Sequence, residues 1–202
     1  LAETQIPKVF LDTSSLVAPD ELNGDLLLME SRTSVRRITC HLLEQGRTLP
    51  GFIGDISYAQ SNRERYEGFC QALADAGKKV DSSLCLTTPL GIDTYREEID
   101  TFLSSLSRMP DAFVCASDYV ACILMQLLEK RGLRVPEDVA VSGFDNNTED
   151  LLAEHLTTVQ VFNEELGARL ALQILYRIKY PNTPHEITYL GTNVLYRDST
   201  GD

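Results

Sequence analysis

Several polar side chains that could bind a small polar ligand lie beyond the expected ends of short apolar strands. In open parallel sheets, ligands bind outside the carboxyl ends of the strands, where such residues collect. An arginine supplies several fixed donors and an aspartate several acceptors, so that together they can hold adjacent hydroxyl groups. Asp12 follows the expected strand at 8–11; Asp55, Ser57 and residues 61–65, which include Arg65, follow the strand at 51–54; Ser117 and Asp118 follow 112–115; Asp145 and Asn146 follow 139–141. Their types predict a cleft for a polyhydroxylated molecule.

Three of the charged candidates, Arg65, Asp118 and Asp145, also have an ordinary structural interpretation. Arg65 could be a surface helix residue that pairs with Glu64 or Glu67. Asp145 follows a glycine and a phenylalanine and could be a turn former. Asp118 could be a favourable charge at a helix N-terminus. The sequence by itself leaves these alternatives open.

The patterns of the common catalytic and metal sites are absent from the sequence. The histidines, His41, His155 and His185, are far apart, and none belongs to an H-E-x-x-H pair. There is no G-x-S-x-G elbow, no P-loop and no dinucleotide-binding glycine motif. We therefore expect no catalytic residues, no metal ion and no cofactor, and we do not expect an enzyme.

Short apolar strands alternate with helical patterns along the chain, which is typical of βαβ units and a mostly parallel sheet. Capping boxes at Ser61–Glu64 and Thr94–Glu97 predict two helix starts, while Ser117 and Asn163 are expected to cap two further helices. Glycines at 46, 77 and 132 are expected to end helices. The strands are expected at residues 8–11, 26–29, 51–54, 80–86, 112–115, 139–141 and 186–195.

Charge and composition restrict the partners of this chain. Its 202 residues carry a net charge of −12, which repels nucleic-acid phosphate. No apolar run approaches the roughly 20 residues that span a bilayer, and the N-terminus lacks the pattern of a signal peptide. The five cysteines contain no C-x-x-C pair. We expect reduced thiols in a cytoplasmic protein without a membrane partner.

Two long motifs resemble the LacI/GalR family, the lactose- and galactose-repressor type of transcriptional regulator. The first is PDAFVCASDYVA at 110–121, and the second is GLRVPEDVAVSGFD at 132–145. Shorter matches follow the same order, with RYEGF at 65–69 and LTTV at 156–159. The resemblance covers nearly the whole chain.

The resemblance implies an α/β fold of the periplasmic-binding-protein-like type I, with two Rossmann-like lobes and three crossings between them. We expect the N-terminal lobe to comprise residues 1–46 and 158–182, and the C-terminal lobe residues 47–157 and 183–202. The chain begins at a strand that resembles one partway through the family's N-terminal lobe. We therefore expect this lobe to be incomplete, with an uncovered sheet edge.

The resemblance also implies a ligand-sensing and dimerisation domain whose effector is usually a sugar. Carried over by position, the effector-binding residues are Arg65, Asp145, Ser117 and Asn163. Ser117 departs from the family's usual asparagine, and Asn163 stands where an aromatic residue is common. A homodimer is implied, with the apolar helix 119–128, Leu151, Leu152 and Leu156 as its candidate patch. Operator DNA would be contacted only through an N-terminal helix-turn-helix that this chain lacks.

Two other classes of protein remain as alternatives on sequence alone. A solute-binding protein of a transport system shares the fold, but it needs an export signal. An enzyme on a doubly wound sheet would need a nucleophile and base, and fold alone does not establish function.

Overall fold

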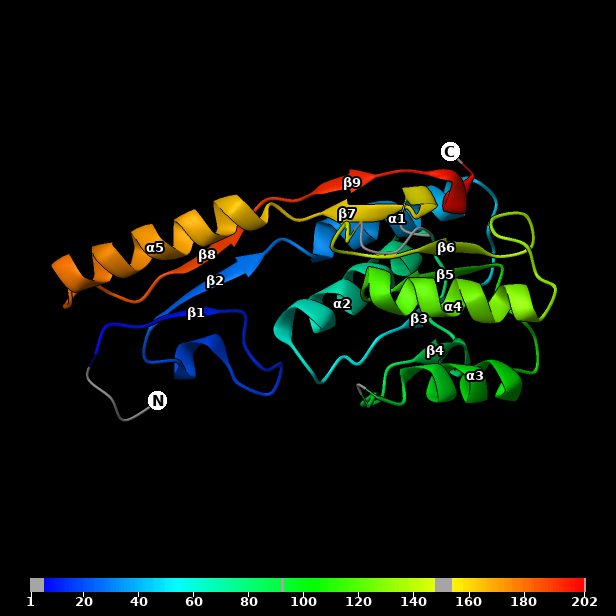
Figure 1. Ribbon diagram of the computed structural model, residues 1–202, viewed down its shortest axis with the longest axis horizontal. Coiled ribbons are helices and arrows are strands. Elements are labelled where there is room, and N and C mark those ends of the chain that lie inside the picture. Colours follow the sequence, from blue (N-terminus) through cyan, green and yellow to red (C-terminus); the bar gives the residue numbers. More distant parts are fainter. Residues whose placement is uncertain (1–5, 92, 148–153, 202) are drawn as a thin grey trace.

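The structure, a computed structural model, describes residues 6–91, 93–147 and 154–201. Two groups of parallel strands lie one after the other along an elongated molecule, each with its own helices (Figure 1). We call the group around β1, β2 and β8 the first lobe, and the group around β3 to β6 the second lobe. The predicted α/β class with parallel sheets is confirmed.

The first lobe is a three-stranded parallel sheet in the order β1-β2-β8, with helix α5 lying along it (Figure 1). Its strands are β1 (Val9–Leu11), β2 (Asp25–Met29) and β8 (Ile187–Leu190), and α5 spans Asn163–Lys179. The central strand, β2, buries Leu26, Leu27 and Leu28. Among the described residues, β1 pairs with β2 alone and so leaves one side of the sheet open.

The second lobe is a four-stranded parallel sheet, in the order β4-β3-β5-β6, between two pairs of helices. One apolar cluster joins the sheet to α1 and α2, and the other joins it to α3 and α4. Coverage on both faces explains why Ala112 to Cys115 form an unbroken apolar run. The strands are β3 (Pro50–Ile53), β4 (Cys85–Leu86), β5 (Ala112–Cys115) and β6 (Ala140–Ser142), and the helices are α1 (Arg32–Glu44), α2 (Gln60–Asp75), α3 (Tyr95–Ser105) and α4 (Asp118–Lys130).

A two-stranded antiparallel ribbon of β7 (Thr158–Gln160) and β9 (Asn193–Leu195) extends the second lobe. Isolated bridges join Ser142 to Thr157 and Asp145 to Gln160. The chain passes between the lobes three times, after β2, after β7 and after β8 (Figure 1). Three crossing segments are the natural positions for a hinge between the lobes.

The pairing of two elements differs from the predicted division into lobes. Helix α1 was assigned to the first lobe, but Val35, Ile38 and Leu42 pack in the core of the second. Residues 183–202 were assigned to the second lobe, but β8 pairs with β2 in the first. The apolar pattern of 186–195 predicted one strand, whereas the chain crosses between the lobes at Gly191 and Thr192 and forms two.

The predicted helix caps are only partly correct. Ser117 does cap α4, since its side chain accepts a hydrogen bond from the Val120 amide. Neither capping box forms. The N-cap of α2 is Ala59 in place of the predicted Ser61, whereas Thr94 is the N-cap of α3 as predicted but its side chain makes no cap hydrogen bond. Asn163 is the first residue of α5 and follows Phe162 at the N-cap position. The expected strand at 80–86 is reduced to β4, since the Asp81 side chain caps a short 3₁₀ turn, Ser82–Leu84, before it.

Helix α4 is buried mainly within its own lobe, where Val120, Ala121, Leu124 and Leu128 all join the apolar core. Core packing thus accounts for most of its apolar residues, and the dimer stays a prediction. Leu151 and Leu152 of the predicted dimer patch lie outside the described residues. All five cysteines are free thiols. Among the described helices, none has the length and hydropathy needed to cross a membrane.

Candidate effector site

Arg65 is placed by the close packing of α2 against α1. One turn further along α2, Gly68 lies so near α1 that a Cβ atom there would stand 2.2 Å from the Arg32 carbonyl oxygen. A larger residue at this position would push α2 away from its neighbour. The glycine of the RYEGF motif therefore holds α2 in place, and with it Arg65 at the carboxyl end of the second-lobe sheet.

The Arg65 guanidinium is buried, with only 4% of the residue exposed. Its Nη1 donates to the Ala116 carbonyl oxygen, directly after β5, and its Cζ atom lies 3.7 Å from the centre of the Phe144 ring. Burial lowers the pKa of Arg65, and the negative charge of Asp145 opposes this change. Within the described residues, its buried Nε has no acceptor. Arg65 is therefore a fixed donor group with one N–H still to satisfy.

Asp145 meets Arg65 from the loop after β6. Its Oδ1 atom lies 3.5 Å from Arg65 Nη2, and its side chain remains 43% exposed. Burial raises the pKa of Asp145, and the charge of Arg65 opposes this rise. The backbone of Asp145 has φ +111°, a conformation that non-glycine residues adopt at a cost of roughly 1–3 kcal/mol. In this conformation the Asp145 carboxylate faces the arginine and stays partly open to solvent.

Ser117 and Asp118 lie beside the same arginine, immediately after β5. The side chain of Ser117 is committed to capping α4. Asp118 is buried and accepts hydrogen bonds from Thr158 Oγ1 at 2.6 Å and the Asn147 amide at 2.8 Å. Burial raises the pKa of Asp118 to about 6 despite these two bonds. A buried carboxyl group thus lies near Arg65, and the net charge of this region depends on whether Asp118 is protonated.

Asn163 is not brought into this cluster. It is exposed at the start of α5, in the first lobe, beyond the crossing that follows β7. The structure thus brings together Arg65 and Asp145, places Ser117 beside them, and leaves Asn163 apart. The role of all four in effector binding stays a prediction.

Asp12 is a further residue of the site region; the sequence marked it as a strand-end acid, but it is not among the four effector-binding positions that the resemblance implies. It lies in the first lobe with φ +58°, and its carboxylate reaches the start of α2 in the second lobe. Its charge also acts on Arg65. Two features of the sequence pointed to Asp12: its position at the end of a strand, which it shares with Asp145, and the expectation of two lobes.

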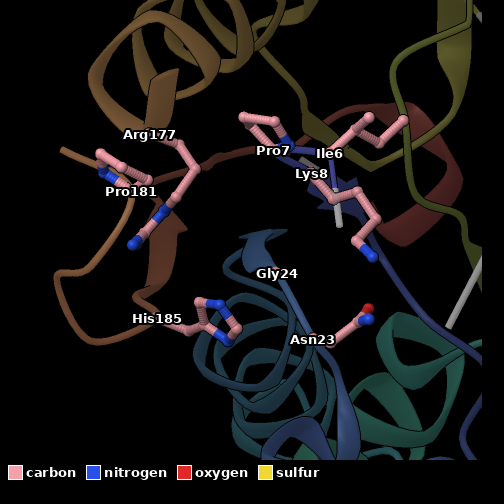
Figure 2. A pocket seen from close by; sticks show the side chains of 8 residues that line it. All are labelled: Ile6, Pro7, Lys8, Asn23, Gly24, Arg177, Pro181 and His185. Carbon is pink, nitrogen blue, oxygen red and sulfur yellow. The ribbon is translucent and has the colours of Figure 1, made fainter. Parts of the chain in front are cut away.

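A separate polar cavity of about 240 Å³ lies at the opposite, amino-terminal end of the first-lobe sheet, lined by Lys8, Asn23, Arg177 and His185 (Figure 2). Arg177 is only 3% exposed, and it forms a buried ion pair with Asp25 through Nε and Nη2. Its Nη atoms also donate to the carbonyl oxygens of Thr183 and Pro184. The guanidinium is thus already saturated, and we assign it a structural role.

Metal binding has no support in the described part of the chain, where no three histidine, cysteine or acidic side chains converge in a way that could hold an ion. The arrangement of Arg65 and Asp145 instead offers charged donors and acceptors for neutral polar groups. Such charge-assisted hydrogen bonds contribute about 1.5–3 kcal/mol each when shielded from water.

Comparison with known proteins identifies the class of this fold. Residues 39–200 match the model of the periplasmic binding protein-like domain. The chain therefore belongs to the family of periplasmic binding protein-like domains.

The individual relatives are transcriptional regulators. The chain is 31% identical over 170 residues to the HTH-type transcriptional regulator DegA of Bacillus subtilis, covering 83% of this chain and 48% of DegA. It is 27% identical over 202 residues to the HTH-type transcriptional repressor PurR of Vibrio cholerae, covering 100% of this chain and 59% of PurR. The chain spans about half the length of the curated relatives it matches.

Solved structures of transcriptional regulators share this fold. A LacI-family transcriptional regulator from Sanguibacter keddieii superposes with a TM-score of 0.82 at 27% identity, covering 100% of this chain and 75% of the other. The complex of the transcriptional regulator CelR with cellobiose gives the same TM-score and identity, covering 95% of this chain and 58% of the other. The relatives are regulators rather than enzymes, and they favour the regulator over the solute-binding alternative.

Proposed function

We propose that this chain is the ligand-sensing part of a transcriptional regulator and that it binds a sugar-like effector between its two lobes. The observation that carries the proposal is the meeting of Arg65 and Asp145 at the carboxyl ends of β5 and β6. Family membership and the cellobiose complex of CelR support the class of ligand.

The two charged groups have complementary tasks in this proposal. The buried Nε of Arg65 donates to a ligand oxygen, while the exposed part of the Asp145 carboxylate accepts from a neighbouring hydroxyl. Ser117 supports the site through its position after β5, and Asn163 adds a polar contact from the first lobe as the lobes close. The effector shifts the balance between lobe arrangements only if it binds one of them better.

In the whole regulator, we propose a homodimer in which this shift changes the spacing of two DNA-contacting heads. The acidic chain itself is a poor partner for operator DNA, since its net charge is −12. In this proposal a helix-turn-helix part, of the kind for which the relatives are named, contacts the DNA. The regulator acts in the cytoplasm.

The test is isothermal titration calorimetry of this chain against a panel of mono- and disaccharides. The conservative variants Arg65→Lys and Asp145→Asn remove the fork and the charge respectively, and Asp20→Asn is the control on an exposed loop. We expect saturable binding of one panel member and at least a tenfold weaker affinity in each site variant, corresponding to about 1.4 kcal/mol. Binding with unchanged affinity in both variants would remove these residues from the site.

A further inference from the structure

Helix α2, which carries Arg65, begins without a cap of its own. Ala59 occupies the N-cap position and has no side-chain acceptor. The first amides of a helix have no partner within the helix and need acceptors from elsewhere. Here the first helical hydrogen bond is accepted by the Ala59 carbonyl from Arg63, so the Gln60 and Ser61 amides depend on other groups.

Those groups come from the first lobe. The Gln60 amide donates to the Thr13 carbonyl oxygen at 2.8 Å, and the Ser61 amide donates to Asp12 Oδ1 at 3.4 Å. The Ser61 hydroxyl donates to Asp12 Oδ2 at 2.6 Å. The loop after β1 reaches toward this end of α2 in Figure 1. The helix of the second lobe is therefore capped by a carboxylate and a carbonyl of the first.

A second contact between the lobes reaches the residue next to Arg65. The Tyr189 hydroxyl, from β8, donates to Glu64 Oε1 at 2.8 Å. Glu64 is only 3% exposed, and Gln60 Nε2 also donates to the same oxygen, at 3.2 Å. If the lobes part, this buried carboxylate loses its tyrosine partner at the same time as α2 loses its cap.

The backbone of Asp12 is shaped for this contact. Its φ of +58° is unusual for a residue other than glycine, and its Oδ1 atom also accepts from the Thr13 amide at 2.7 Å. The carboxylate is thus held in a fixed orientation toward Ser61. Strain of this kind persists only where the surrounding structure maintains it.

We propose that the first lobe caps α2 through Asp12 and Thr13, with Tyr189 as an adjoining clasp, so that lobe closure and order in the first turns of α2 are one coupled event. Asp12 is accordingly a positioning residue for Arg65. The proposal depends on the proposed function only for its functional consequence. That consequence is that an effector that holds the lobes together also fixes the arginine that binds it.

Hydrogen exchange of the Gln60 and Ser61 amides tests the coupling without any effector. Since neither amide has a partner within α2, their protection reports the contact between the lobes. We expect Asp12→Ala to speed their exchange about fivefold, the effect typical of losing an N-cap. Asp12→Asn keeps an acceptor and is expected to retain part of the protection. The control is Asp20→Ala, an exposed aspartate on the loop between β1 and β2.

Small-angle scattering of the same variants and of Tyr189→Phe tests whether uncapping opens the lobes. We expect a larger radius of gyration for Asp12→Ala and for Tyr189→Phe than for the wild type, and no change for Tyr176→Phe, a tyrosine exposed on α5. Unchanged amide exchange in Asp12→Ala, or faster exchange with an unchanged radius in both variants, would overturn the coupling. If Asp12→Ala fails to fold, the comparison of Asp12→Asn and Tyr189→Phe decides by the same criteria. Failure of sugar binding alone would overturn the proposed function and leave these results unaffected.

Discussion

Asp118 makes the folded state less stable as the pH rises. Its pKa is about 6 in the folded chain because the side chain is buried, whereas the ordinary value is 3.8. Between these values the folded state holds a proton that the unfolded state has released, so the contribution of Asp118 to stability is greatest below pH 3.8 and is lost as the pH rises through 6. The difference of about two units corresponds to a loss of about 3 kcal/mol by pH 7.

Urea unfolding of the wild type and of Asp118→Asn between pH 4 and pH 7.5 measures this loss. Asparagine cannot ionise, so the stability of the wild type relative to the variant is expected to fall by about 2.5 kcal/mol across that range, the remainder of the loss lying below pH 4. Any constant cost of the asparagine cancels, because only the change with pH is compared. The exposed-site variant Asp20→Asn controls for the loss of one negative charge. Parallel stability curves for wild type and Asp118→Asn would refute the reasoning.

Two further substitutions test the packing that supports the site. Asp25→Asn leaves Arg177 buried without its counter-charge and is expected to destabilise the chain by about 3–5 kcal/mol in urea unfolding. Burial raises the pKa of Asp25, but hydrogen bonds from Arg177 and Gln173 outweigh it, so that the pKa lies below its ordinary value. The stabilising contribution of the Asp25 carboxylate is lost as the pH falls through this lowered pKa, so the effect of Asp25→Asn should shrink at low pH. An effect of the substitution that does not depend on pH would contradict this. Gly68→Ala is expected to cost about 1–3 kcal/mol through its clash with the Arg32 carbonyl. The matched control is Gly167→Ala on α5, where an added Cβ meets no atom within 4 Å. There we expect the free energy of unfolding to rise by about 0.5–1 kcal/mol. Equal effects of the two substitutions would contradict the packing argument.

Local patterns were sufficient to predict the alternation of strands and helices. The apolar run before Ser117 and the glycines at 46, 77 and 132 mark element ends that the structure confirms. These signals succeed because they depend on neighbouring residues, such as a serine hydroxyl next to an amide or a positive φ that glycine adopts readily.

The failures come from contacts that are distant in sequence. The sequence predicts Ser61 as an N-cap, but in the structure its hydroxyl donates a hydrogen bond to Asp12, which lies 49 positions away in the sequence. The strand expected at 186–195 is divided because its two halves pair with different lobes, β8 with β2 and β9 with β7. Strand-end position found Arg65 and Asp145, but it could not show that Arg65 would be buried against Phe144.

The most direct test of the central claim is a crystal structure of this chain with the tightest-binding sugar of the panel. We predict that the sugar lies between the lobes, with one of its oxygens within hydrogen-bonding distance of Arg65 Nε and a hydroxyl within that distance of the Asp145 carboxylate. A sugar bound elsewhere on the chain, with Arg65 and Asp145 contacting only protein, would contradict the account.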